Sequence, residues 1–261
     1  MRYGIIDCQY GQRMLATPPE EDGPVWMVNL MQYRARADDG DGDGGRTGRQ
    51  ADDEYAPIDV LRAIGARIVF VADVEEQLLG AEPQWDRVAV VRYASRRSFV
   101  EMQSRPDFQA KHVHKEAGMA ATIIVGCVPG VTPQVPDAPD WSTVAHPPTD
   151  GDGPVVLMHV LRFAERERMR SYEQAAGAVG VPHGVRPTAW LDAEGTIIGD
   201  GREWDQVRFN TFPSRRAFGA VVKDRSRLAA QEAHREPAIA DTYTLVLRPT
   251  TDHLAESLAT A

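Results

Sequence analysis

The chain of 261 residues contains the same pattern of residues twice, in the same order. The segment 22–33, DGPVWMVNLMQY, recurs 130 residues later as DGPVVLMHVLRF. At an offset of 119 residues, the segment 65–86 aligns without a gap to 184–205, and WDRVAVVRYASRRSF aligns to WDQVRFNTFPSRRAF. Near the end of each copy, HKE at 114–116 matches HRE at 234–236. Matches in one order at nearly constant spacing indicate a tandem duplication.

Each copy is predicted to contain six elements in the order strand, helix, strand, strand, helix, strand. In the first copy we expect strands at 25–33, 67–79, 85–93 and 122–128, and helices at 54–64 and 95–116. In the second copy we expect strands at 155–163, 186–198, 204–212 and 242–247. Gly65 fits a glycine cap after the first helix, Ser95 fits the N-cap of the second, and Pro106 is expected to break that second helix.

The fold class that follows is α+β: two tandem ferredoxin-like βαββαβ repeats packed sheet to sheet as a pseudo-symmetric dimeric α+β barrel. A four-stranded sheet with both helices on one face leaves its other apolar face bare, and the second copy covers it. The predicted divisions are an N-terminal extension 1–21, a first repeat 22–130, a proline-rich linker 131–151, a second repeat 152–250 and a tail 251–261. The first repeat holds a Gly- and Asp-rich insertion at 36–52, which we predict to be solvated and mobile because it has little apolar area to bury.

Charge and composition exclude several classes of function. A net charge of −9 leaves no basic excess to release counterions from phosphates, which argues against a nucleic-acid partner. The two cysteines, Cys8 and Cys127, form no disulfide framework and fit a reducing cytosol. No stretch of the sequence is long and apolar enough to span a membrane. We therefore expect a cytoplasmic protein that binds neither nucleic acid nor membrane.

Several motif-like strings are not interpreted as sites. Asp39, Asp41 and Asp43 fit the start of a calcium-binding loop, but the twelfth position is Gln50 and a strand precedes the loop. The segment 175–180, AAGAVG, lacks the first glycine of a dinucleotide fingerprint and is expected at the end of a helix. No P-loop, GxSxG or HExxH string occurs. The sequence therefore predicts no metal site and gives no support to the common hydrolase, kinase and zinc-protease classes.

Polar residues interrupt the apolar strands of the second copy. His159 stands where the first copy has Asn29, and Arg208 and Asn210 share one face of the third strand. We expect these second-copy side chains to point into the space between the two sheets, where the first copy presents mostly apolar groups. This asymmetry favours one specialised pocket in the second copy. Two structural alternatives stay open, a hydrogen-bonded core histidine and an arginine that faces solvent.

Other side chains extend the candidate pocket. Trp190 adds a large ring that would stack on a flat ligand or fill the core, and Met27 and Tyr93 offer further apolar wall. His234 and its counterpart His114 lie late in the second helix of each copy, where a charge that complements the helix dipole is the simpler interpretation.

These motifs resemble those of the dimeric α/β-barrel superfamily. The resemblance rests on VNL in the first strand, WDxV in the third, SRRxF at the start of the second helix, and HKE or HRE near its end. It covers nearly the whole chain apart from the two ends. Duplication at this length is also similar to the angucyclinone B-ring-opening oxygenases of aromatic polyketide pathways, relatives of the antibiotic-biosynthesis monooxygenases. The motifs are structural in character, so they specify the fold better than the reaction.

The resemblance implies an oxygenase that hydroxylates a polycyclic aromatic phenol, or cleaves a carbon–carbon bond in it and opens a ring, with dioxygen as co-substrate. The cofactor would be a reduced flavin, FADH2 or FMNH2, supplied in trans by a flavin reductase, or none. His159 is expected to act as a base near pH 7, while Arg208 and Asn210 hold the phenolate and peroxide oxygens. The expected substrate-binding residues are Asn29, Met27, Tyr93, Trp190 and His234.

Two other classes of function stay open. A non-catalytic barrel that binds a small ligand would be favoured by a pocket without titratable residues. A haem protein, as in some duplicated members of the superfamily, would show a Soret band. The expected partner is a small aromatic molecule, and pairing of two chains into a homodimer is also left open.

Overall fold

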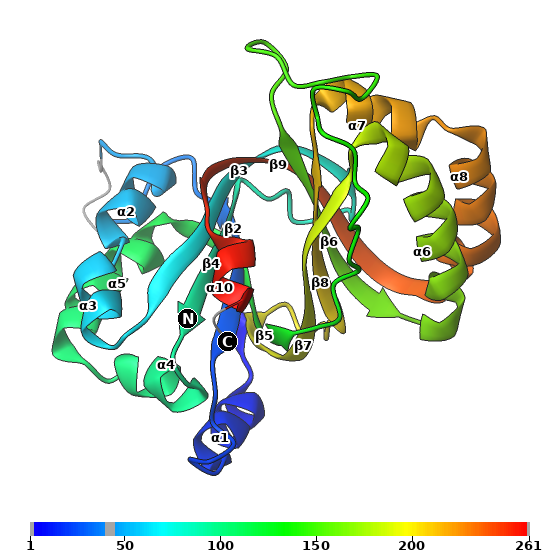
Figure 1. Ribbon diagram of the computed structural model, residues 1–261. Helices are drawn as coiled ribbons and strands as arrows, with labels where there is room; N and C mark the ends of the chain where they lie inside the picture. Colours follow the sequence, from blue (N-terminus) through cyan, green and yellow to red (C-terminus); the bar gives the residue numbers. More distant parts are fainter. Residues whose placement is uncertain (1–2, 40–44, 260–261) are drawn as a thin grey trace.

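The computed structural model describes residues 3–39 and 45–259, and it confirms the predicted α+β fold (Figure 1). The first repeat contributes the strands β2 (Val25–Tyr33), β3 (Arg67–Leu79), β4 (Arg87–Tyr93) and β5 (Met119–Pro129). The second contributes β6 (Val155–Phe163), β7 (Arg186–Gly199), β8 (Gln206–Phe212) and β9 (Ile239–Asp252). These strands form one antiparallel ring in the order β7-β5-β2-β4-β3-β9-β6-β8, and β8 closes it by pairing with β7.

Helices cover the outside of the barrel on two sides (Figure 1). Those of the first repeat are α2 (Gly48–Tyr55), α3 (Ile58–Ala63), α4 (Arg96–Met102) and α5 (Pro106–Gly118). Those of the second repeat are α6 (Arg166–Gly180), α7 (Arg215–Val222), α8 (Arg225–Ala230) and α9 (Glu236–Ala238), with a 3-10 turn at Val181–His183 and a π-helical turn at Gln231–Arg235. The β3–β9 and β5–β7 pairings join the two repeats into one barrel.

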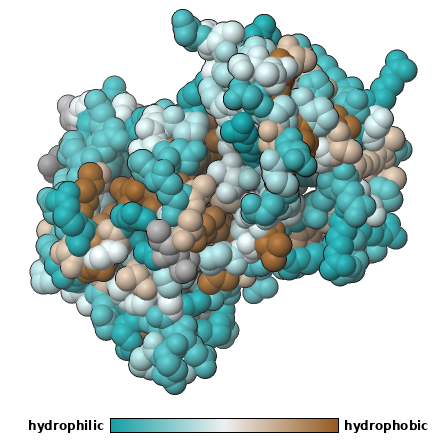
Figure 2. All heavy atoms as spheres, viewed as in Figure 1, coloured by the Kyte–Doolittle hydropathy of each residue, from teal (hydrophilic) through white to brown (hydrophobic). Residues whose placement is uncertain are grey.

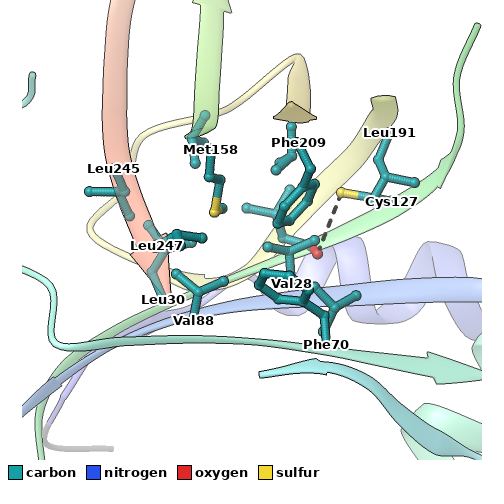
Figure 3. Packing of buried hydrophobic residues seen from close by; sticks show 14 of the residues in the cluster. Val28, Leu30, Phe70, Val88, Cys127, Met158, Leu191, Phe209, Leu245 and Leu247 are labelled. Carbon is teal, nitrogen blue, oxygen red and sulfur yellow. Dashed lines mark hydrogen bonds between the residues drawn. The ribbon is translucent and has the colours of Figure 1, made fainter. Parts of the chain in front are cut away.

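The inside of the barrel is a packed apolar core. Along β2, Trp26, Val28 and Leu30 point inward, whereas their neighbours on the strand point to the helices, as the two-residue period of a strand requires. Figure 3 shows side chains of both repeats interdigitating in this space. Those labelled there are Val28, Leu30, Phe70, Val88 and Cys127 from the first repeat and Met158, Leu191, Phe209, Leu245 and Leu247 from the second.

The two cysteines test this packing. Cys8 is exposed on α1 (Cys8–Ala16), whereas Cys127 points into the barrel core, where burial raises the pKa of its thiol. Because the thiolate is the reactive form, we expect a thiol reagent to modify one cysteine per native chain and two in denaturant. Peptide mapping should find the native label on Cys8. Rapid labelling of Cys127 in the native protein would contradict the inward orientation of its side chain on β5.

The arginines of the SRR motif form ion pairs between the two repeats. Arg96 at the start of α4 forms an ion pair with Glu194 on β7, and Arg215 at the start of α7 pairs with Glu75 on β3 at 2.6 Å. The two pairs are equivalent under the 119-residue offset, so they repeat one contact on both sides of the pseudo-two-fold axis. Ser95 caps α4 as predicted, accepting a hydrogen bond from the Ser98 amide at 3.0 Å.

Both end segments pack against the barrel. The short strand β1 (Ile5–Ile6) pairs with the edge of β7, and Tyr10 and Met14 of α1 are buried. At the other end, helix α10 (Leu254–Ala259) buries Leu254 in the barrel core. The indole nitrogen of Trp26 donates a hydrogen bond to the hydroxyl of Ser257 at 2.9 Å. The C-terminal helix therefore covers part of the barrel core.

The prediction that the insertion 36–52 is solvated is wrong for residues 48–52. Helix α2 begins at Gly48, well before the predicted start at 54, because Thr47 and Gln50 form a capping box. Ala51 is buried against Ala37 and Ala117, which gives this segment the apolar contacts that its composition did not reveal. The aspartates of the calcium-like string, apart from Asp39, lie outside the described residues. In the part of the chain that is described, no cluster of His, Cys, Asp or Glu could hold a metal ion.

The surface is mostly hydrophilic on the face shown in Figure 2, where hydrophobic residues form small separate patches. Within residues 3–39 and 45–259, none of the helices combines the length and the apolar character needed to cross a membrane.

Candidate functional site

The candidate site of the second repeat is a cavity of 200 Å³ between its sheet and its helices. Strands β6, β7 and β8 form its floor, and helices α6, α7 and α8 form its walls. The three predicted polar residues, His159, Arg208 and Asn210, all line it. Our expectation that they point into the space between the sheets is therefore wrong. Alternation shows which residues share a face, but both faces of these strands are largely apolar, and the inner face is the one completely filled with apolar side chains.

A single row of side chains crosses the floor of the cavity. In the strand register, Trp190 on β7 lies beside Arg208 on β8, Arg208 beside His159 on β6, and His159 beside Thr244 on β9. Cross-strand neighbours on one face are close enough to interact directly. The sequence pattern identified three members of this row, and the register adds Thr244.

The equivalent row in the first repeat is apolar except at one position. It runs from Val71 through Ala89 and Asn29 to Ile124. The predicted asymmetry between the repeats is therefore present on the sheet. Where the first repeat has Val71, Ala89 and Asn29, the second has an aromatic ring, a guanidinium and an imidazole.

Arg208 is held by three neighbours. Its guanidinium lies 3.8 Å above the ring of Trp190, forms an ion pair with Glu173 of α6 at 2.7 Å, and donates to the side chain of Gln206. Burial lowers the pKa of Arg208, and the Glu173 carboxylate opposes that effect. Trp190 in turn donates its indole hydrogen to the amide oxygen of Asn210 at 3.2 Å. These contacts fix one charged and one aromatic wall of the cavity.

His159 is neutral at pH 7. Its Nδ1 lies 3.0 Å from the hydroxyl oxygen of Thr244, and burial together with the positive charges of Arg235, Arg208 and Arg227 lowers its pKa well below 6.5. A histidine in this setting resists protonation, so the predicted role of a base poised near pH 7 is not supported by the electrostatics. The imidazole offers a hydrogen bond to a ligand instead.

The depressed pKa of His159 has a consequence for stability. The unfolded chain binds a proton at this histidine below about pH 6.5 and the folded chain does not, so acid should favour unfolding. Below pH 6.5, we expect the free energy of unfolding to fall more steeply with decreasing pH in the wild type than in His159→Gln. The difference between the two slopes should be up to about 1.4 kcal/mol per pH unit. Urea titrations of both proteins at pH 7.5, 6.5 and 5.5 measure this difference. If the free energy of unfolding depended on pH equally in the two proteins, the pKa of His159 would not be lowered by folding.

The sequence reasoning missed Arg235. Its side chain is 6% exposed, lines the cavity and leaves Nη2 without a hydrogen-bond partner among the described residues. It lies in the π-helical turn Gln231–Arg235, a widened geometry that is frequent at functional sites. The signal was present in the HRE motif, but the prediction selected His234, which does not line the cavity. Arg227 and Tyr172 also line the cavity, and no sequence pattern marked them.

The remaining predicted residues belong elsewhere. Met27, Asn29 and Tyr93 line a separate cavity between the sheet and the helices of the first repeat. The sequence placed them in one pocket with His159 because it assigned all of them to the space between the sheets. The closed barrel instead directs the two sets outward into different helical layers.

Comparison with known proteins supports the fold. No family model and no curated protein matches the chain. A solved anthrone oxidase-like protein is 12% identical, with a TM-score of 0.53 over 90% of this chain and 96% of that one. The chain folds as a dimeric α+β barrel. A protein of unknown function from Rhodopseudomonas palustris is 24% identical, with a TM-score of 0.43 over 52% of this chain and 100% of that one. A chlorite dismutase variant from Candidatus Nitrospira defluvii is 11% identical, with a TM-score of 0.49 over 95% and 98%. At these identities the likeness concerns the barrel fold alone.

The cavity of the second repeat is small for a flavin or a haem. Its 200 Å³ lies below the roughly 300–1,000 Å³ typical of sites for drug-sized ligands. A haem is larger still, and the imidazole that would bind it, His159, is held by Thr244 and surrounded by arginines. The cavity suits one compact, flat molecule.

Proposed function

We propose that this protein is an oxygenase that binds a polycyclic aromatic phenol as its phenolate in the cavity of the second repeat and lets it react there with dioxygen. The observation that carries the proposal is the charge of the cavity lining. Three guanidinium groups, those of Arg208, Arg227 and Arg235, and one carboxylate, that of Glu173, are the charged groups of a mostly apolar lining. A cavity with apolar walls and excess positive charge favours a flat molecule that carries a negative charge.

The same electrostatics favour the reactive form of the substrate. Nearby positive charges lower the pKa of a bound phenol, so the phenolate forms without a strong protein base. Arg235, a lining residue whose Nη2 has no hydrogen-bond partner among the described residues, is the cation expected to hold the phenolate oxygen. Trp190 and Tyr172 supply aromatic surfaces for the ring system, and neutral His159 supplies a further hydrogen bond.

The reaction with dioxygen follows from this charge state. The phenolate transfers one electron to dioxygen, and the two radicals combine to form a carbon–oxygen bond and a peroxide anion. The peroxide then attacks the neighbouring ring carbonyl and closes a four-membered peroxide ring. Cleavage of the oxygen–oxygen and carbon–carbon bonds of that ring leaves a carboxylate and a carbonyl group, so both oxygen atoms enter the product. The arginines stabilise the negative charge as it moves from the phenolate to the peroxide. No step in this route requires an external reductant, which agrees with the small volume of the cavity.

A non-catalytic role in binding an aromatic anion is the second candidate. The observation that favours it is the depressed pKa of His159, because the cavity then lacks a histidine base matched to neutral pH. Both candidates share the ligand class and differ in whether dioxygen is consumed.

Oxygen uptake separates the two functions. We expect the purified chain to consume dioxygen with two- and three-ring phenols in the absence of flavin. Arg235→Met should lose most of this uptake, whereas Arg225→Met, which removes an exposed arginine on α8, should retain it. Tight binding of the phenols without oxygen uptake would favour the binding role, and a lack of binding would exclude both.

A further inference from the structure

The first repeat has its own cavity at the position equivalent to the proposed oxygenase site. It measures 240 Å³ and lies between the sheet and helices α2 to α5. Lys115 lines it from α5 and occupies the HKE position that corresponds to Arg235 in HRE. Both repeats therefore place a cationic side chain from the late second helix over the outer face of the sheet.

Lys115 is buried and has no hydrogen-bond partner among the described residues. Its side chain is 6% exposed, and its nitrogen lies 5.3 Å from the centre of the Tyr55 ring. No hydrogen bond or ion pair of this nitrogen occurs in residues 3–39 and 45–259. The carboxylate that acts on its charge, Asp52, already accepts a hydrogen bond from the Tyr33 hydroxyl at 2.6 Å and pairs with Arg87 at 3.4 Å. An amine that is buried in this way is costly unless a ligand supplies an acceptor.

A second group in the cavity is also unsatisfied. His112, one turn before Lys115 on α5, contacts the hydroxyl of Tyr3 through Nε2 at 3.2 Å. Its buried Nδ1 has no hydrogen-bond partner within the described part of the chain. Burial lowers the pKa of this imidazole. Two polar groups without partners among the described residues thus line one cavity whose other walls include Phe108 and Tyr93.

The charge balance differs from that of the second repeat. The charged groups that line this cavity are two cations, Arg87 and Lys115, and two carboxylates, those of Asp52 and Asp53. Arg87 contacts both carboxylates, at 3.4 Å and 2.8 Å. With no excess positive charge, the cavity gives an anion no general advantage, and the available recognition element is a single donor among aromatic walls.

We propose that the first repeat contains a second small-molecule site that binds an uncharged, flat aromatic ketone or quinone by a hydrogen bond from Lys115 to its carbonyl oxygen. Tyr55, Tyr93 and Phe108 contact the ring system, and the paired Arg87 contributes no free charge. The site differs from the anionic site of the second repeat in both ligand charge and donor. It does not depend on the oxygenase reaction.

Binding of 9-fluorenone, a neutral flat ketone, tests the proposal by calorimetry on the full chain. We expect saturable binding that Lys115→Met weakens at least tenfold, while Lys111→Met, on the same helix but outside the cavity lining, leaves it unchanged. Arg235→Met should also leave it unchanged, which separates this site from that of the second repeat. No binding to the wild type, or equal binding to Lys115→Met, would overturn the proposal.

An infrared measurement on the wild type avoids reliance on the folding of Lys115→Met. The carbonyl stretch of bound fluorenone, isolated by a 13C label at that carbon, should lie at lower frequency than in an apolar solvent because the oxygen accepts a hydrogen bond. A bound ketone with the unshifted frequency would contradict a lysine contact.

Discussion

Arg235→Met is expected to weaken the binding of 2-naphthol at neutral pH by roughly tenfold to a hundredfold. Arg235 is the buried cation of the second-repeat cavity whose Nη2 has no partner in the described residues, so a phenolate oxygen would complete its hydrogen bonding. Hydrogen bonds to charged groups contribute about 1.5–3 kcal/mol, and each 1.4 kcal/mol is a tenfold change in affinity. Fluorescence titration measures the affinity, and the longer-wavelength absorption of the naphtholate reports the charge of the bound ligand.

Two controls make this experiment specific. Naphthalene, which has the same rings without the hydroxyl group, should bind the wild type and Arg235→Met with similar affinity. Arg225→Met should bind 2-naphthol as the wild type does, because Arg225 is exposed on α8. If 2-naphthol bound as the neutral phenol, with equal affinity for all three proteins, the arginine cluster would have no part in recognition.

Leu247→Ala is expected to lower the free energy of unfolding of the whole chain by about 2–5 kcal/mol. Leu247 is 0% exposed in the barrel core, where residues of both repeats surround it (Figure 3). Removal of a buried leucine side chain costs the lost transfer free energy and leaves a cavity. The matched change Leu228→Ala, at a leucine that is 44% exposed, should cost well under 1 kcal/mol. Urea unfolding monitored by tryptophan fluorescence gives both values.

The same variant shows whether the repeats unfold together. Cys127 belongs to the first repeat and Leu247 to the second, yet both side chains lie in one core. The denaturant midpoint for labelling of Cys127 should therefore shift with Leu247→Ala as far as the fluorescence midpoint does. An unchanged Cys127 midpoint would show that the repeats are independent domains.

Periodicity predicted the fold well because the repeat provided each element twice. The strands at 25–33, 67–79 and 155–163 match β2, β3 and β6 at both ends. The helix at 54–64 was less accurate, since α2 begins within a polar insertion and owes its start to the capping box at Thr47. Tertiary contacts of Ala51, which no local pattern encodes, determine that the segment is packed.

The candidate site was predicted in part. Alternation placed His159, Arg208 and Asn210 on one face, and the structure brings them into one cavity. It could not show which face turns toward the helices, because that depends on which set of apolar side chains fills the barrel. Nor could it find Arg235, whose orientation depends on a π-helical turn rather than on a regular helical period.

Incorporation of 18O from labelled dioxygen tests the central claim most directly. Purified protein is incubated with a two- or three-ring phenol that carries a ring carbonyl, under 18O2 and without flavin, and the product is analysed by mass spectrometry. We predict a ring-opened product that contains two 18O atoms, formed by the wild type and by Arg225→Met but strongly reduced in Arg235→Met. Full recovery of unlabelled phenol from the wild type, under conditions where the phenol is shown to bind, would contradict the assignment of this cavity as an oxygenase site.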